Sequence, residues 1–177
     1  MNSSEDRYPI GAFKGKDTYQ KEEVDALIEE IALLPDRIVK EVDGMTNEQL
    51  DTPYRDGGWS IRQVIHHLAD SHMNAYIRMK WALTESTPLI KAYDEKAWAE
   101  TSETKLDPQI SLALLKSLHL KWVALIRGLS EKDLNRAFTH PETKKNQSLM
   151  KMIAIYSWHS NHHLAHITSL KQRMGWS

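Results

Sequence analysis

Seven of the nine histidines fall in two short windows of the chain. In chain order these are His66, His67 and His72, followed by His159, His162, His163 and His166. Neutral imidazole is the commonest ligand for transition metals in proteins. Two histidines four residues apart lie on one face of a helix and can bind the same ion. A third histidine from another element gives three protein ligands and an open position, which is typical of catalytic metal sites.

The second window contains two such pairs, and helical periodicity separates them. The apolar stripe of this segment passes through Met152, Tyr156, Ile167, Leu170 and Met174. His163 falls inside the stripe and His159 at its edge, so this pair is predicted to face the core. The rival pair, His162 and His166, is expected to be half solvated. A polar helix face that is merely rich in histidine is the alternative interpretation.

The first window is less decisive. His67 lies at one edge of its apolar stripe, His66 lies on the polar side, and His72 is nearer the centre. Periodicity therefore does not choose between His67 and His72 as a third ligand. Either residue, taken alone, also fits a histidine that is hydrogen-bonded in the core.

Four long segments with a 3.6-residue apolar period would position these side chains. They cover residues 21–43, 60–84, 107–129 and 148–175. Glycine is scarce, β-branched alternation is hard to find, and no repeat or composition break divides the chain. We therefore predict an all-α protein, a four-helix bundle formed by a single domain over residues 1–177.

Local signals indicate where these helices begin and end. Ser60 and Gln63 form a capping box, and Asp107 is expected to cap a helix that starts with Pro108. Gly175 suits a left-handed C-terminal cap. Pro35 is expected to kink or split the first helix. Between the helices we expect a long connection over 86–106, a helical turn near 130–137 and a loop over 138–147.

Composition excludes several classes of function. A formal net charge of -1 argues against nucleic-acid binding through bulk electrostatics. With a mean hydropathy of -0.55 and no apolar run near 18 residues, we expect no membrane-spanning helix. The N-terminus lacks an apolar leader segment, which indicates a cytoplasmic protein. The absence of cysteine removes disulfides, thiolate metal sites and a cysteine nucleophile.

Several motifs together resemble the YfiT branch of the DinB/YfiT superfamily. The stretches DGGWSIRQVIHHLADSHMNAYIRMKWALTE and YSWHSNHHLAHITSLKQRMGWS carry most of the likeness, and RYPIG, LDTPYR and AYDEKAW also fit. The resemblance implies a four-helix bundle that binds one divalent metal, Zn²⁺ or Ni²⁺, through His67, His159 and His163. For His67 the resemblance alone supplies the choice. The late family motif often has a further histidine where this chain has Asn161.

The resemblance also implies an activity. The family is described as metal-dependent hydrolases that are cytoplasmic and homodimeric, and they act on small-molecule substrates. Some members of similar sequence are S-transferases that use the low-molecular-weight thiol bacillithiol. A divalent ion can activate either water or a thiol. A non-catalytic binding module with a structural ion is a third possibility, and a fourth protein ligand such as His72 would favour it.

A few further residues are candidates for supporting roles. Asp70 is the carboxylate nearest in sequence to a proposed ligand, and it could act as a general base or orient a histidine. A solvent-facing aspartate is the alternative.

Trp59 and Trp158 could wall a pocket, although tryptophans in such positions usually pack in a core. Arg55, Asp56 and Arg62 are expected to tether a loop rather than to bind substrate.

Overall fold

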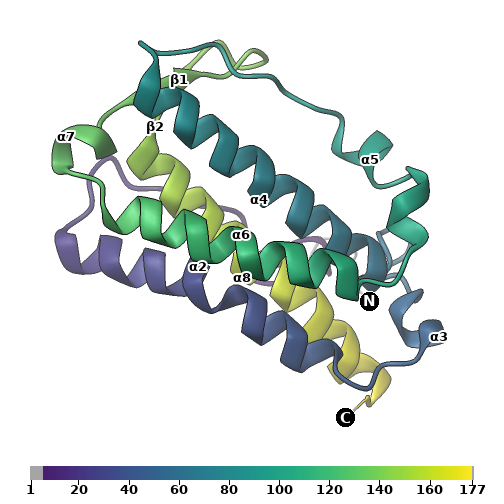
Figure 1. The fold of residues 1–177 in the computed structure, drawn as a ribbon. Coiled ribbons are helices and arrows are strands. Elements are labelled where there is room, and N and C mark those ends of the chain that lie inside the picture. Colours follow the sequence, from purple (N-terminus) through teal and green to yellow (C-terminus); the bar gives the residue numbers. More distant parts are fainter. Residues whose placement is uncertain (1–5, 177) are drawn as a thin grey trace.

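Four long helices dominate the computed structural model, which describes residues 6–176 (Figure 1). They are α2 (Lys21–Val42), α4 (Ile61–Thr84), α6 (Gln109–Arg127) and α8 (Leu149–Met174). Both α2 and α4 pack against α6 and α8, so α6 and α8 lie between the first two long helices. The prediction of an all-α four-helix bundle is confirmed.

Short elements connect the long helices. They are α3 (Asn47–Leu50), α5 (Glu95–Trp98), the 3₁₀ helix η1 (Ser102–Lys105), α7 (Glu131–Leu134), β1 (Ala137–Thr139) and β2 (Asn146–Ser148). β1 and β2 form an antiparallel hairpin in which Phe138 is opposite Gln147. The expectation of a plain loop over 138–147 is therefore wrong at both ends. Three residues per strand are too few for alternation to show in the sequence.

The predicted helix ends are close to those observed. Ser60 accepts a hydrogen bond from the amide of Gln63, whose side chain bonds back to the Ser60 amide. Gly175 ends α8 with a φ of 67°, the left-handed conformation that glycine tolerates. Helix α6 begins one residue later than predicted, at Gln109 with Pro108 in the cap position, and the Asp107 carboxylate accepts a hydrogen bond from the Gln109 amide at 2.9 Å.

Pro35 lies inside α2 without splitting it. A proline lacks the amide hydrogen that would bond to the carbonyl four residues earlier, here that of Ile31. In this protein the Ile31 carbonyl accepts a hydrogen bond from Nδ1 of His119 on α6 at 2.7 Å. A side chain from a neighbouring helix thus satisfies the carbonyl that Pro35 leaves free.

Two apolar clusters form the core. One contains Ala75, Trp122 and Tyr156, and the other contains Leu68, Leu115 and Ile167. On each of α4, α6 and α8, the stretch between the two clusters carries histidines. These are His72 on α4, His119 on α6, and His159, His162, His163 and His166 on α8. A layer of imidazoles, of which His159 is half-buried and the others are buried, therefore divides the apolar interior.

Helix α6 is the most apolar of the long helices. Within the described residues it alone has the length and hydropathy of a membrane-spanning helix, so the expectation of no such helix stays a prediction. Core helices of globular proteins can have the same length and hydropathy. Here Leu112, Leu115, Trp122 and Ile126 are buried in the bundle, which accounts for much of this apolar character.

Candidate metal centre

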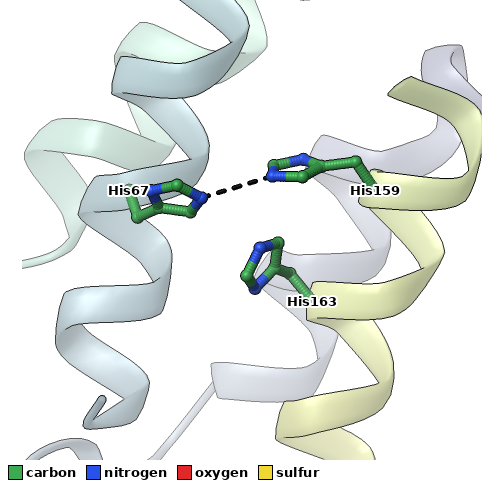
Figure 2. A group of neighbouring side chains, drawn as sticks. All are labelled: His67, His159 and His163. Atoms are coloured by element: carbon green, nitrogen blue, oxygen red, sulfur yellow. Dashed lines mark hydrogen bonds between the residues drawn. The ribbon is translucent and has the colours of Figure 1, made fainter. Parts of the chain in front are cut away.

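Three imidazoles converge where α4 and α8 pack together. His67 comes from α4, and His159 and His163 come from successive turns of α8 (Figure 2). One ring nitrogen from each lies within 4.8 Å of the other two. Nε2 of His67 and Nε2 of His159 are 3.2 Å apart, so a single proton or cation fits between these two atoms. The structure thus brings together the residues that sequence and resemblance singled out.

Burial keeps these rings neutral. It lowers the pKa of His67 to about 4, with the neighbouring His162 as a second cause. Burial also holds the pKa of His159 and of His163 well below the usual value, and neighbouring histidines add to this effect. Neutral imidazoles offer the lone pair that a metal ion requires.

His72, the other candidate on α4, lies behind the cluster rather than in it. Its Nε2 is 3.1 Å from Nδ1 of His159, and its Nδ1 is 2.8 Å from Nε2 of His119. Both ring nitrogens therefore have histidine partners. Its surroundings match those of a core histidine that is fully hydrogen-bonded.

The rival pair on α8 is more buried than expected. His162 and His166 are only 8% and 3% exposed, so the expectation that they are half solvated is wrong. The ring of Tyr54 stacks on His166 at 3.9 Å, and the ring of Trp158 stacks on His162 at 4.5 Å. The N-terminal segment adds to this cover, because the ring centroid of Tyr8 lies 5.7 Å from that of His162. Helical periodicity within α8 cannot predict cover that comes from segments far away in the sequence.

The three clustered histidines line a cavity of about 590 Å³. Trp59 and Trp158 also line it, together with Tyr8 and Tyr54. The ring centroids of Trp59 and His67 are 4.6 Å apart. Aromatic walls with a few convergent polar groups are typical of small-molecule sites. The cavity is large enough for a small organic substrate.

Asp70 is placed three residues after His67 on α4, half-buried near Glu103. Burial, reinforced by the charge of Glu103, raises the pKa of Asp70 to about 6. Asp70 is not among the residues that line the cavity. Its role as a base or as an orienting group stays a prediction.

Other charged residues do line the cavity. Glu95 and Glu100 stand on the connection between α4 and α6, together with Lys96. Burial raises the pKa of the Glu95 carboxyl. The sequence analysis assigned no role to these residues, although Glu95 and Lys96 belong to the AYDEKAW motif.

Arg62, in the first turn of α4, and Arg55, in the loop before it, have different roles. Arg62 binds Asp51, Asn47 and the Leu106 carbonyl, which confirms its tethering role. Arg55 differs, because it lines the cavity and its Nε is buried without a hydrogen-bond partner in the described part of the chain. Its Nη1 donates to the Asp56 carbonyl at 2.9 Å.

Comparison with known proteins places this chain in a family. The sequence profile of the DinB superfamily matches residues 30–167. "Putative metal-dependent hydrolase YfiT" of Bacillus subtilis (strain 168) is 52% identical over 178 residues and all of both chains. A relative from Bacillus thuringiensis subsp. konkukian (strain 97-27), also named as a metal-dependent hydrolase, is 50% identical over 96% of this chain and 98% of its own. The solved structure of YfiT from Bacillus subtilis, described as "a probable metal-dependent hydrolase with an unusual four-helix bundle topology", covers 98% of this chain and 99% of its own. The TM-score of that match is 0.95. The chain therefore belongs to the DinB superfamily.

Proposed function

We propose that the protein is a metal-dependent hydrolase of small molecules, with one divalent ion held by His67, His159 and His163. The observation that carries this proposal is the convergence of three imidazoles on the wall of a cavity. The names of the relatives from Bacillus subtilis and Bacillus thuringiensis support it.

The donor set suits the proposed ion. Three imidazoles kept neutral by burial match the ligand preferences of Zn²⁺ and Ni²⁺, and we propose one of these two metals. Three protein ligands leave a coordination position open for water or substrate. When bound, such an ion lowers the pKa of a coordinated water to about 7 and polarises a carbonyl group.

For the proton transfer that hydrolysis requires, we propose Asp70. A carboxyl with a pKa near 6 is suited to exchange a proton near neutral pH. Glu95, whose pKa is also raised, is the rival within the cavity. Loss of turnover in Asp70→Asn but not in Glu95→Gln would favour Asp70, and the reverse result would assign the role to Glu95.

Thiol S-transfer is the second candidate function. The chain has no cysteine, so any thiol must come from a cosubstrate, and bacillithiol is our proposal for it. Arg7, Arg55 and Lys96 line the cavity and would attract an anionic thiol. The same cluster of histidines would stabilise the reactive thiolate through its ion.

We also propose that the protein is a cytoplasmic homodimer. Ile110, Leu114 and Leu120 are exposed on α6, and a subunit interface would cover apolar side chains of this kind. Light scattering coupled to size exclusion tests this proposal directly. A mass corresponding to one chain would contradict it.

The test of the metal centre compares wild type with His163→Ala, and with His140→Ala as a matched control outside the cluster. We expect about one zinc or nickel ion per chain in wild type and in the control, and almost none in His163→Ala. Mass spectrometry of untagged protein measures the metal content. Protein that binds no metal after reconstitution would contradict the proposal.

The metal-loaded protein is then assayed for activity. Hydrolysis of model amides and esters supports the first function, and coupling of bacillithiol to an electrophile supports the second. An ion closed off by a fourth protein ligand, with neither activity, would indicate a non-catalytic module.

A further inference from the structure

Further histidines are hydrogen-bonded in a chain behind His159. The Nδ1 atom of His159 lies 3.1 Å from Nε2 of His72. Nδ1 of His72 lies 2.8 Å from Nε2 of His119, and Nδ1 of His119 lies 2.7 Å from the carbonyl oxygen of Ile31. This chain of contacts, the long relay, crosses the bundle from α8 through α4 and α6 to α2.

The end of the long relay sets the direction of every hydrogen bond in it. A carbonyl oxygen only accepts, so the hydrogen of neutral His119 must be on Nδ1. Its Nε2 then accepts from Nδ1–H of His72, and Nε2 of His72 accepts from Nδ1–H of His159. His159 is left with a lone pair on Nε2, which is the atom 3.2 Å from His67.

A shorter chain stands behind His163 and leads to the same result. Nδ1 of His163 lies 3.4 Å from Nδ1 of His166, and Nε2 of His166 lies 3.2 Å from the carbonyl oxygen of Arg7. That carbonyl requires the hydrogen of His166 to be on Nε2. Nδ1 of His166 then accepts from Nδ1–H of His163, which leaves the lone pair of His163 on Nε2.

The carbonyl at the end of the long relay is free for a physical reason. In the interior of a helix, each carbonyl normally accepts from the amide four residues later. Residue 35 is proline, so the Ile31 carbonyl has no such donor. Burial lowers the pKa of His119 to about 4, which keeps this ring neutral and its single hydrogen committed to Ile31.

We propose that His72, His119 and His166 are positioning residues that fix the tautomers of two metal ligands. Through them, His159 and His163 both carry hydrogen on Nδ1 and present Nε2 lone pairs to the same ion. Metal-binding histidines commonly donate a hydrogen bond from the N–H of their second ring nitrogen to a fixed acceptor, and loss of that partner weakens metal binding about 10- to 100-fold. The expected effect on metal affinity rests on the proposed metal centre. The tautomers themselves are a property of the metal-free protein.

The first test measures tautomers in metal-free wild-type protein. Long-range proton–nitrogen correlation NMR of histidine-labelled protein distinguishes Nδ1–H from Nε2–H rings. We expect Nδ1–H for His72, His119, His159 and His163, and Nε2–H for His166. Hydrogen on Nε2 of His119 or His72 would overturn the long relay, and hydrogen on Nδ1 of His166 would overturn the short one.

The second test measures zinc affinity in two variants of His119. Glutamine can donate to the Ile31 carbonyl and accept from His72, whereas leucine fills the space without polar atoms. We expect His119→Leu to bind zinc about 10- to 100-fold more weakly and His119→Gln to keep most of the affinity. Equal affinity in the two variants, with both folded by circular dichroism, would overturn the proposal.

The two tests separate failure of the relay from failure of the metal centre. A wild type that binds neither zinc nor nickel but shows the expected tautomers contradicts only the proposed function. A wild type that binds zinc but has other tautomers contradicts only the relay. Neither NMR result depends on whether the leucine variant folds.

Discussion

His67 and His72 are five residues apart on α4 and have different surroundings. His67 lines the cavity and lies beside Trp59, with its Nε2 near Nε2 of His159. His72 is fully buried, and histidines occupy both of its ring nitrogens. His72 is not among the cavity-lining residues and contacts His159 at Nδ1, whereas His67 faces the other nitrogen, Nε2, from the cavity wall, and for this reason we propose His67 as the ligand.

Substitution of these two residues should therefore have different effects. We expect His67→Ala to lose almost all bound zinc, because it removes one of three ligands. We expect His72→Ala to keep about one zinc per chain at saturation, with affinity weakened about 10- to 100-fold. Metal titration with a competing chelator measures both quantities. Loss of stoichiometric binding in His72→Ala alone would show that the third ligand is His72.

At the scale of the element, the start of α4 sets the position of His67. Ser60 and Gln63 satisfy each other's backbone amides, and the helix reaches His67 two turns later. Gly58 precedes this cap where space is short, since an added Cβ would lie 2.7 Å from Cγ of Arg55. The loop and the cap together determine where α4 begins relative to the cavity.

Removal of the cap should weaken the fold by a measurable amount. We expect Ser60→Ala to lower the free energy of unfolding by about 1 kcal/mol, because an amide at the helix start loses its partner. Ser117→Ala is the matched control, since Ser117 is exposed and bonds only to a carbonyl of its own helix. Urea denaturation of the metal-free proteins compares the two. An equal loss in both variants would show that the cap contributes nothing specific.

At the scale of the whole molecule, the layer of imidazoles makes stability depend on pH. Burial is the largest cause of a lowered pKa at eight of the nine histidines. These are His66, His67, His72, His119, His159, His162, His163 and His166. The unfolded chain binds protons near the ordinary histidine pKa of about 6.5. Below that pH it binds more protons than the folded protein, so acid favours unfolding.

We therefore expect the free energy of unfolding of metal-free protein to fall as pH drops from about 6.5 towards 4. Each fully neutral buried histidine contributes a slope of up to about 1.4 kcal/mol per pH unit. Asp70 opposes this trend, because its raised pKa makes the folded protein take up a proton below about pH 6. Asp70→Asn should thus steepen the loss. Urea denaturation across this range measures it, and a flat profile would contradict the burial of neutral imidazoles.

Local patterns in the sequence determined the four helices, their caps and the pairing of His159 with His163. These features depend on residues at most four positions apart, so periodicity and capping signals capture them. The hairpin of β1 and β2 was not predicted, because its strands are too short to show an alternating pattern in the sequence.

Only the tertiary structure decided the rest. Which α4 histidine joins the α8 pair depends on how two distant helices pack, and the cover over His162 and His166 comes from Tyr8, Tyr54 and Trp158. The link from Pro35 to His159 passes through four helices that no local pattern relates. A hydrogen bond between segments far apart in the chain follows from the packing of those segments, and spacing along the sequence does not encode it directly.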